Sequence, residues 1–306
     1  MGSAISEEQL EMMREKTQKI QKVVFVISFI IFLFLLFLVY VASGHIQDAS
    51  AFDIIKLLIV AVALAFGIFV LLWMIIVKST YDKFNEAYKT KYVLYTISQI
   101  DGFKDLEFMP KSGFSWMDIK NAGIVNCGQE RYYESEDLLS GTYENVGFKI
   151  SDVTTKKVVR RDDDDRVEEI FKGQVMCLHR FDDFKTSDGY LQIFENQFLS
   201  GMAGWKAEHH IETEDEAFNK RFSIYTDDEH NAYYILTPQR MEKIMRFADL
   251  VDSQVSLVFH DKELFVAAKR DSMFDADMSV PVKEQTTKIT EDAIFIQKVK
   301  EILVEE

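Results

Sequence analysis

Two long apolar blocks dominate the hydrophobic pattern of the chain. Residues 23–42 read VVFVISFIIFLFLLFLVYVA and residues 57–77 read LLIVAVALAFGIFVLLWMIIV, and neither block holds a charged residue. Each has about the 20 residues that an α-helix needs to cross a hydrocarbon core of about 30 Å. Core helices rarely run this long without a polar face, and the first block follows too many polar residues for a signal peptide. The pattern predicts two transmembrane helices, over 23–43 and 57–77, joined by a short external loop over 44–56.

The segments that flank these blocks also have the pattern of helices. Residues 1–22 predict a short amphipathic helix on the cytoplasmic side, with Ser6 as its N-cap. Residues 78–100 predict a stalk helix, because aromatic residues at spacings of three and four share one face, namely Tyr81, Phe84, Tyr88, Tyr92 and Tyr95. Such a helix either transmits signals and oligomerises or packs against its own domain. A second apolar stripe, which includes Ile97, favours the packed helix.

Residues 101–306 have the pattern of a domain that mixes strands and helices. Runs of β-forming residues predict strands over 145–153, 174–181, 189–196, 222–226, 232–236, 255–260 and 264–269. Helices are predicted over 116–122, 237–251 and 290–306, the second with Thr237 as N-cap and Pro238 at its first position. Because the strands follow one another in series, we predict one mainly antiparallel α+β domain.

Basic residues around the two apolar blocks predict their orientation. Four precede the first block and four follow the second, whereas the connecting segment holds only Lys56 against Asp48 and Asp53. Positive residues concentrate on the cytoplasmic side of membrane helices. We therefore expect a multi-pass protein in the lipid bilayer with both termini in the cytoplasm.

The overall charge limits the partners of the cytoplasmic domain. The chain has a net charge of −15, and residues 1–78 hold six basic and six acidic residues, so the whole excess falls on residues 79–306. An acidic surface repels phosphate backbones. Nucleic acid is not expected as a partner.

The two cysteines fit a reducing compartment, because a secreted domain of this size usually carries a disulfide framework. Cys177 and His179 stand two residues apart in a predicted strand, so their side chains point to the same face and offer two metal ligands. A zinc site needs three or four ligands, and no pair with suitable spacing lies nearby in the sequence. We favour a half-buried strand in which the cysteine packs as a small apolar residue.

Acidic runs are the other candidates for a metal site. The stretch RRDDDDRVEE, residues 160–169, lacks the alternating oxygen ligands, glycine and glutamate of a calcium-binding loop, and it predicts a solvated turn. Asp227 and Glu229 alternate like calcium ligands, but the required glycine and glutamate are missing after them as well. We interpret residues 222–236 as a β-hairpin whose polar tip faces solvent.

The chain has no G-x-S-x-G elbow, Walker loop, H-E-x-x-H helix or G-x-G-x-x-G fingerprint. A non-enzymatic protein that needs no cofactor is therefore the leading expectation. The alternative is a membrane-tethered enzyme, or a sensor of a small ligand or metal, that uses the acidic groups at 182–183 and 227–229. A channel or transporter is disfavoured, since two helices without an intramembrane charge offer no ion path unless several copies assemble.

Three stretches resemble a bacterial membrane-protein family catalogued as domain of unknown function 3137. They are YYESEDLLSG at 132–141, EEIFKGQV at 168–175 and EDEAFNKRFSIYTDDEHNAYYILTPQRMEKI at 214–244. The positions that carry the resemblance are Asp137, Gly141, Phe171, Gly173, Phe218, Asn219, Phe222, Asp228, Ala232, Tyr234, Leu236, Thr237 and Pro238. The family often has an arginine where Tyr233 stands, so any ion pair or ligand of that arginine is lost here.

The resemblance implies a setting and a kind of partner. Members place membrane helices before an acidic α+β domain, and their genes often lie beside those of LemA-type membrane proteins. It implies a bacterial inner-membrane protein, and it carries no catalytic residues. We expect a scaffold or accessory subunit that binds another membrane protein, a LemA-type one being a candidate, or further copies of itself.

Overall fold

The computed structural model describes residues 5–45, 51–161, 164–179, 189–196, 206–207, 209–251 and 253–303. The chain divides into two compact units. The first contains Met1–Tyr92 and Ala276–Gln285, and the second contains Val93–Asp275 and Thr286–Glu306.

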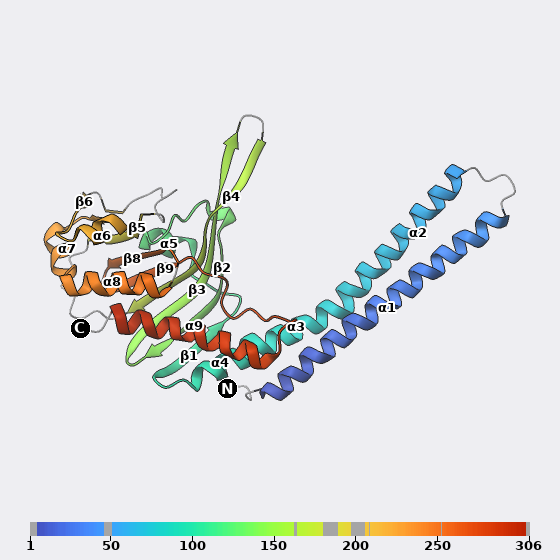
Figure 1. The fold of residues 1–306 in the computed structure, drawn as a ribbon, viewed down its shortest axis with the longest axis horizontal. Coiled ribbons are helices and arrows are strands. Elements are labelled where there is room, and N and C mark those ends of the chain that lie inside the picture. The colour runs from blue at the N-terminus through green and yellow to red at the C-terminus, as the bar shows by residue number, and fades with distance from the viewer. Residues whose placement is uncertain are drawn as a thin grey trace. The chain divides into compact units, whose positions relative to one another are not determined.

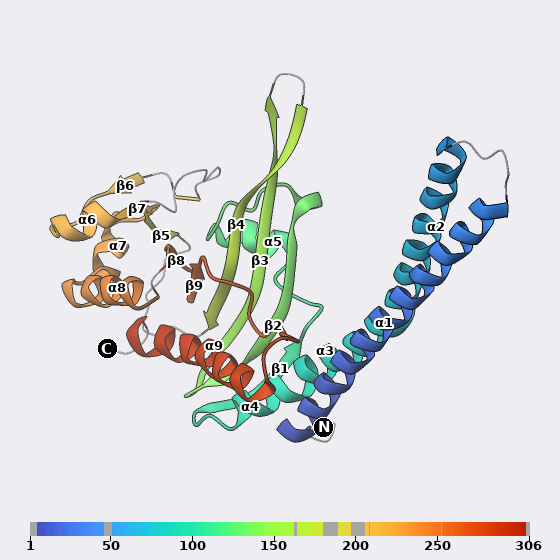
Figure 2. The ribbon, with the colours of Figure 1, turned by 45° about the vertical axis from the view of Figure 1, so that its right-hand side comes forward.

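The first unit is built on two long helices that run antiparallel, side by side (Figures 1 and 2). They are α1 (Glu7–His45) and α2 (Ala51–Leu72), and a π-helical turn η1 (Trp73–Val77) joins α2 to α3 (Lys78–Ala87). Ser6 caps α1 as predicted, because its hydroxyl accepts the Gln9 N–H at 3.2 Å while the Gln9 side chain accepts the Ser6 N–H. The predicted amphipathic segment and first apolar block therefore form one continuous helix.

Both helices, and the turn η1 that follows α2, expose apolar side chains. Phe25 is 63% exposed, Phe66 is 67% exposed and Ile75 is 68% exposed. Exposing so much apolar surface to water is unfavourable, and such surfaces are typical of membrane or protein contacts. Each helix is long and apolar enough to span a membrane. The segment 276–285 packs on the polar start of α1, where Arg14 Nη1 donates to Met278 O at 2.9 Å and Glu11 accepts the Val282 N–H at 2.8 Å.

The predicted aromatic face after the second apolar block forms only in part. Phe84, Tyr88 and Tyr92 are buried, whereas Tyr81 and Tyr95 are exposed. The helical residues continue through a π-helical stretch η2 (Tyr88–Val93) into α4 (Leu94–Ser98). A π turn inserts an extra residue. The side chains after it are therefore rotated relative to a regular helix, and Ile97 becomes the buried position instead of Tyr95.

The second unit contains a nine-stranded sheet in the order β1-β2-β3-β4-β9-β8-β5-β7-β6, in which neighbouring strands are antiparallel. The strands are β1 (Phe103–Met109), β2 (Glu134–Tyr143), β3 (Val146–Arg161), β4 (Asp164–His179), β5 (Leu191–Glu195), β6 (His209–Ile211), β7 (Phe222–Thr226), β8 (Val255–His260) and β9 (Glu263–Ala268). The far ends of β3 and β4 pair only with each other, as a two-stranded ribbon (Figure 2).

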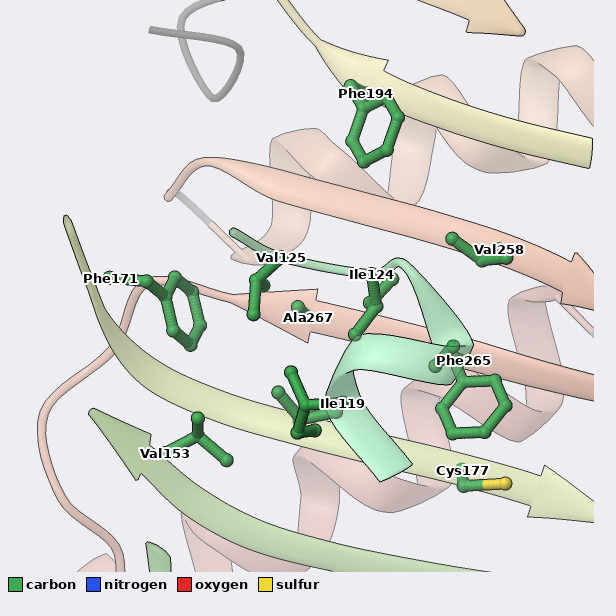
Figure 3. Packing of buried hydrophobic residues seen from close by; sticks show 12 residues of the cluster. Ile119, Ile124, Val125, Val153, Phe171, Cys177, Phe194, Val258, Phe265 and Ala267 are labelled. Carbon is green, nitrogen blue, oxygen red and sulfur yellow. The ribbon is translucent and has the colours of Figure 1, made fainter. Parts of the chain in front are cut away.

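Helices cover the two faces of this sheet unequally. One face packs under the short helix α5 (Trp116–Ala122), and its core contains Ile119, Ile124 and Phe194 (Figure 3). On the opposite side lie α8 (Pro238–Val251) and the part of α9 (Val282–Leu303) that belongs to this unit, where Phe247 and Phe295 pack with ring centroids 6.2 Å apart. Shorter helical segments are η3 (Glu130–Tyr132), α6 (Glu216–Arg221) and α7 (Glu229–Ile235).

The predicted α+β class and antiparallel pairing are confirmed, and α5 and α8 have the predicted bounds to within one residue. The prediction of a hairpin over 222–236 is wrong in its second half. Residues 232–236 belong largely to α7, because the Asp228 carboxylate accepts the Asn231 N–H at 3.0 Å and starts a helix. Strands β1, β2 and β6 were not predicted, and α9 begins eight residues earlier than expected.

Candidate functional site

A cavity of about 530 Å³ opens beside α5, on the face of the sheet that this helix covers. Its floor is formed by the adjacent strands β3, β4 and β9, and the side chains that line it include Asp118, Lys149, Cys177, His179, His260 and Glu263. The apolar core ends at this point. Figure 3 shows Cys177 and Phe265 at the end of the buried cluster, on neighbouring strands.

Three potential metal ligands meet in this cavity. Cys177 and His179 point to the same side of β4, as their spacing predicts, and Glu263 lies opposite His179 on β9. His179 Nδ1 is 2.7 Å from Glu263 Oε1 and 3.9 Å from Cys177 Sγ. One ligand atom from each of the three residues lies within 4.8 Å of the others.

Burial and charge affect the Cys177 thiol and the Glu263 carboxyl differently. Cys177 is almost fully buried, and this burial, together with the Glu263 carboxylate, raises the pKa of its thiol well above the ordinary value. The hydrogen bond from His179 lowers the pKa of Glu263, against the opposing effect of burial. The metal-free thiol is therefore protonated at neutral pH, and the carboxylate is ionised.

This arrangement differs from a cysteine–histidine–acid relay. In such a relay one imidazole nitrogen takes the proton of the nucleophile while the other is held by the acid. Here the same atom, His179 Nδ1, faces both the thiol and the carboxylate. An ionised carboxylate only accepts hydrogen bonds, so Nδ1 carries the proton and cannot take another from Cys177.

Tyr190, His260 and Asp261 form another part of the cavity wall. Tyr190 stacks on His260 with ring centroids 3.8 Å apart, and its hydroxyl donates to Asn121 O at 2.8 Å. Burial and nearby acids raise the pKa of Tyr190. His260 Nε2 lies 3.1 Å from Asp261 Oδ2. These contacts connect the β8–β9 turn to the end of α5.

A separate cluster of buried acids lies elsewhere in the second unit. Burial raises the pKa of Asp152 to about 8 and that of Asp292 to about 6. The Met273 N–H donates to Asp152 Oδ2 at 2.8 Å, and Arg270 Nη2 lies 3.5 Å from Asp292 Oδ1. Asp152 Oδ1 and Asp292 Oδ2 have no hydrogen-bond partner among the residues that the structure describes.

The structure places the residues proposed from the sequence in different regions. Cys177 and His179 share the cavity, and their third partner, Glu263, was missed because it lies 84 residues along the chain from His179. Only the strand order brings them together. Asp227 and Glu229 are exposed at the start of α7 and do not belong to the three-residue cluster. The acids at 182–183 lie outside the described residues.

Most positions that carry the family resemblance have structural roles. Phe218 and Phe222 are buried with ring centroids 4.8 Å apart, and Asp228 is the N-cap of α7. Thr237 accepts the Arg240 N–H at 3.3 Å, and Pro238 begins α8. The remaining positions are in the sheet, in α6 or in α7 and its C-terminal end, namely Asp137, Gly141, Phe171, Gly173, Asn219, Ala232, Tyr234 and Leu236.

The residue at the position where the family often has arginine has a contact of its own. The hydroxyl of Tyr233 donates to Glu212 O at 3.1 Å, and its side chain is about half exposed. This hydrogen bond holds α7 near the end of β6.

Comparison with known proteins agrees with the resemblance. Residues 169–304 match a family model described as "Protein of unknown function (DUF3137)". The matched region includes all three residues of the cavity cluster. No curated protein and no solved structure matches the chain.

Proposed function

Because residues 169–304 belong to the DUF3137 family and two membrane-length apolar helices precede them, we propose a bacterial inner-membrane scaffold or accessory subunit. Its two helices cross the bilayer as a hairpin, and both termini lie in the cytoplasm. The acidic α+β domain acts there by binding another membrane protein, for which a LemA-type protein is a candidate, or further copies of this chain.

The exposed apolar side chains of α1 and α2 are the observation that carries this proposal. Side chains such as Phe25 and Phe66 are more than half exposed. A lipid bilayer would remove their apolar surface from water, which is favourable. The basic residues at the cytoplasmic ends, among them Lys22 and Lys78, support the orientation.

A binding role is further supported by the protonation and hydrogen bonding of Cys177 and His179 in the cavity. The thiol of Cys177 is protonated, and the Nδ1 of His179 is occupied by Glu263, so neither is prepared for nucleophilic attack. The cavity favours one alternative function, a sensor of a small ligand or metal, because its polar side chains converge on a single space.

Topology is tested with reporters fused after residue 306. We expect a reporter that folds only in the cytoplasm to be active and one that requires export to be inactive. A second fusion within residues 46–50, which follow α1, should give the reverse pattern. Activity of the exported reporter at the C-terminus would overturn the proposed orientation.

The binding role is tested by purification from native membranes in mild detergent. Two differently tagged copies are expressed together, and an unrelated two-helix membrane protein of the same topology serves as the control. We expect a second membrane protein, or the second tagged copy, to be recovered with this chain and not with the control. A strictly monomeric chain that recovers neither would contradict the scaffold role.

A further inference from the structure

We propose that Cys177, His179 and Glu263 form a zinc site with one open coordination position facing the cavity. The site goes beyond the scaffold role and does not depend on it. The three residues offer a thiolate sulfur, an imidazole nitrogen and a carboxylate oxygen, which are the ligand types that Zn²⁺ takes in proteins. The thiolate ligand disfavours Ca²⁺ and Mg²⁺, which prefer oxygen.

The observed distances are close to those a metal requires. Zinc–ligand lengths of about 2.0–2.3 Å in a tetrahedron put neighbouring ligand atoms roughly 3.3–3.6 Å apart. His179 Nδ1 and Cys177 Sγ are 3.9 Å apart, and His179 Nδ1 and Glu263 Oε1 are 2.7 Å apart. Small side-chain rotations would bring Cys177 Sγ closer to His179 Nδ1 and move the Glu263 carboxylate away from it. Zinc would then replace the hydrogen bond between His179 and Glu263.

The strands hold the ligands in place. His179 and Glu263 are directly opposite on β4 and β9, and Cys177 stands two residues before His179 on the same face. Sites on rigid strands keep their geometry better than sites on loops. Lys149 lies opposite Cys177 on β3 and also lines the cavity, so its ammonium faces a site whose three ligands carry two negative charges.

Zinc binding is a ligand exchange. The Sγ–H bond of Cys177 breaks, the Sγ–Zn bond forms, and the proton leaves to solvent through the cavity. The proton on His179 Nδ1 also leaves to solvent while Nε2 carries a proton, so the ring binds zinc through Nδ1 as a neutral imidazole. Three protein ligands leave a fourth position for water or for a donor atom of a ligand in the 530 Å³ space.

The test uses the full chain, purified in detergent and stripped with a chelator. Co²⁺ is added first, because a cobalt–thiolate bond gives a charge-transfer absorption that carboxylate or imidazole binding lacks. We expect one equivalent of Co²⁺ per chain to give this absorption and one equivalent of Zn²⁺ to remove it. Absence of the absorption in the folded wild-type chain would overturn the proposal.

Variants show which side chains bind the metal. Cys177→Ser should abolish the absorption, and His179→Gln and Glu263→Gln should each weaken Zn²⁺ binding by more than the roughly 10–100-fold loss seen when a hydrogen-bond partner of a metal ligand is removed. Cys127→Ser and His230→Gln are the matched controls, because neither residue lines the cavity, and they should bind as the wild type does. If circular dichroism shows that Cys177→Ser is unfolded, Cys127→Ser decides alone. Absorption that persists in this variant assigns the metal to Cys177, and loss of the absorption would assign it to Cys127 and overturn the proposal.

Discussion

His179 and Glu263 are directly opposite residues of strands β4 and β9, and His179 Nδ1 lies 2.7 Å from Glu263 Oε1. Their side chains are 35% and 34% exposed, so this contact is at the boundary between the apolar core and the open cavity. Opposite residues of an antiparallel pair have Cβ atoms about 4.5–5.5 Å apart. The sheet register alone therefore brings the imidazole and the carboxylate into hydrogen-bonding range.

Glu263→Gln is expected to lower the free energy of unfolding of the metal-free chain by about 0.2–1 kcal/mol at neutral pH, the range for solvent-exposed pairs of this kind. His179 lowers the pKa of Glu263. The stabilisation is therefore present above the unfolded pKa of the carboxyl and is lost as the pH falls through its lowered pKa. Urea unfolding of wild type and variant should show a difference near pH 7 that closes under acid conditions.

A double-variant comparison isolates the pair. His179→Gln alone should destabilise the chain by a similar amount, and the double variant should lose less than the sum of the two single losses. Additive losses would show that the two side chains do not interact in the folded chain.

The buried carboxyl of Asp152 should give the free energy of unfolding the opposite dependence on pH. Burial raises its pKa to about 8, so the folded chain holds this proton more tightly than the unfolded chain does. The stabilisation from the bound proton is complete below the unfolded pKa of about 3.9 and is lost as the pH rises through about 8. We expect the free energy of unfolding of the wild type, relative to Asp152→Asn, to decrease from pH 5 to pH 8 and then to level.

Urea unfolding followed by circular dichroism at several pH values measures this difference. Glu107→Gln is the matched control, since Glu107 is an exposed carboxyl on β1. The control should follow the wild type across the range. A pH profile of Asp152→Asn parallel to that of the wild type would contradict a protonated Asp152.

Sequence periodicity predicted those parts of the fold whose signals are local. The Thr237–Pro238 start and apolar spacing of α8 are contained in consecutive residues, and so are the two apolar helices. Residues 232–236 were wrongly predicted as a strand because their tyrosines and isoleucine favour strands. The Asp228 cap starts a helix there instead, and this contact outweighs the strand propensity of the residues that follow.

The cavity cluster could be predicted only in part for a related reason. The spacing of Cys177 and His179 places them on one face of a strand, but nothing in the sequence indicates that β9 is the neighbour of β4. The register that pairs His179 with Glu263 depends on strand order across the whole sheet. For the same reason, burial of the acid cluster around Asp152 could not be read from the sequence.

Asp228→Ala tests whether the Asp228 cap starts α7. Removing the carboxylate leaves the Asn231 N–H without its acceptor, and loss of an N-cap destabilises by about 0.5–2 kcal/mol. Asp228→Asn retains a side-chain oxygen for the same hydrogen bond, so it should lose much less. Urea unfolding at neutral pH measures both. Equal losses would indicate that the charge, and not the cap, is what the position contributes.

Two glycines of neighbouring strands give the sharpest test of the sheet packing. A Cβ at Gly173 would lie 2.1 Å from Ala268 O, a backbone atom of β9 that cannot move aside, whereas a Cβ at Gly147 would meet only His179, at 3.7 Å. Overpacking of this kind typically costs about 1–3 kcal/mol. We expect Gly173→Ala to lower the free energy of unfolding by at least that amount and Gly147→Ala to change it by less than about 0.5 kcal/mol. Similar values for the two variants in urea unfolding would mean that β4 and β9 are not in close contact at Gly173.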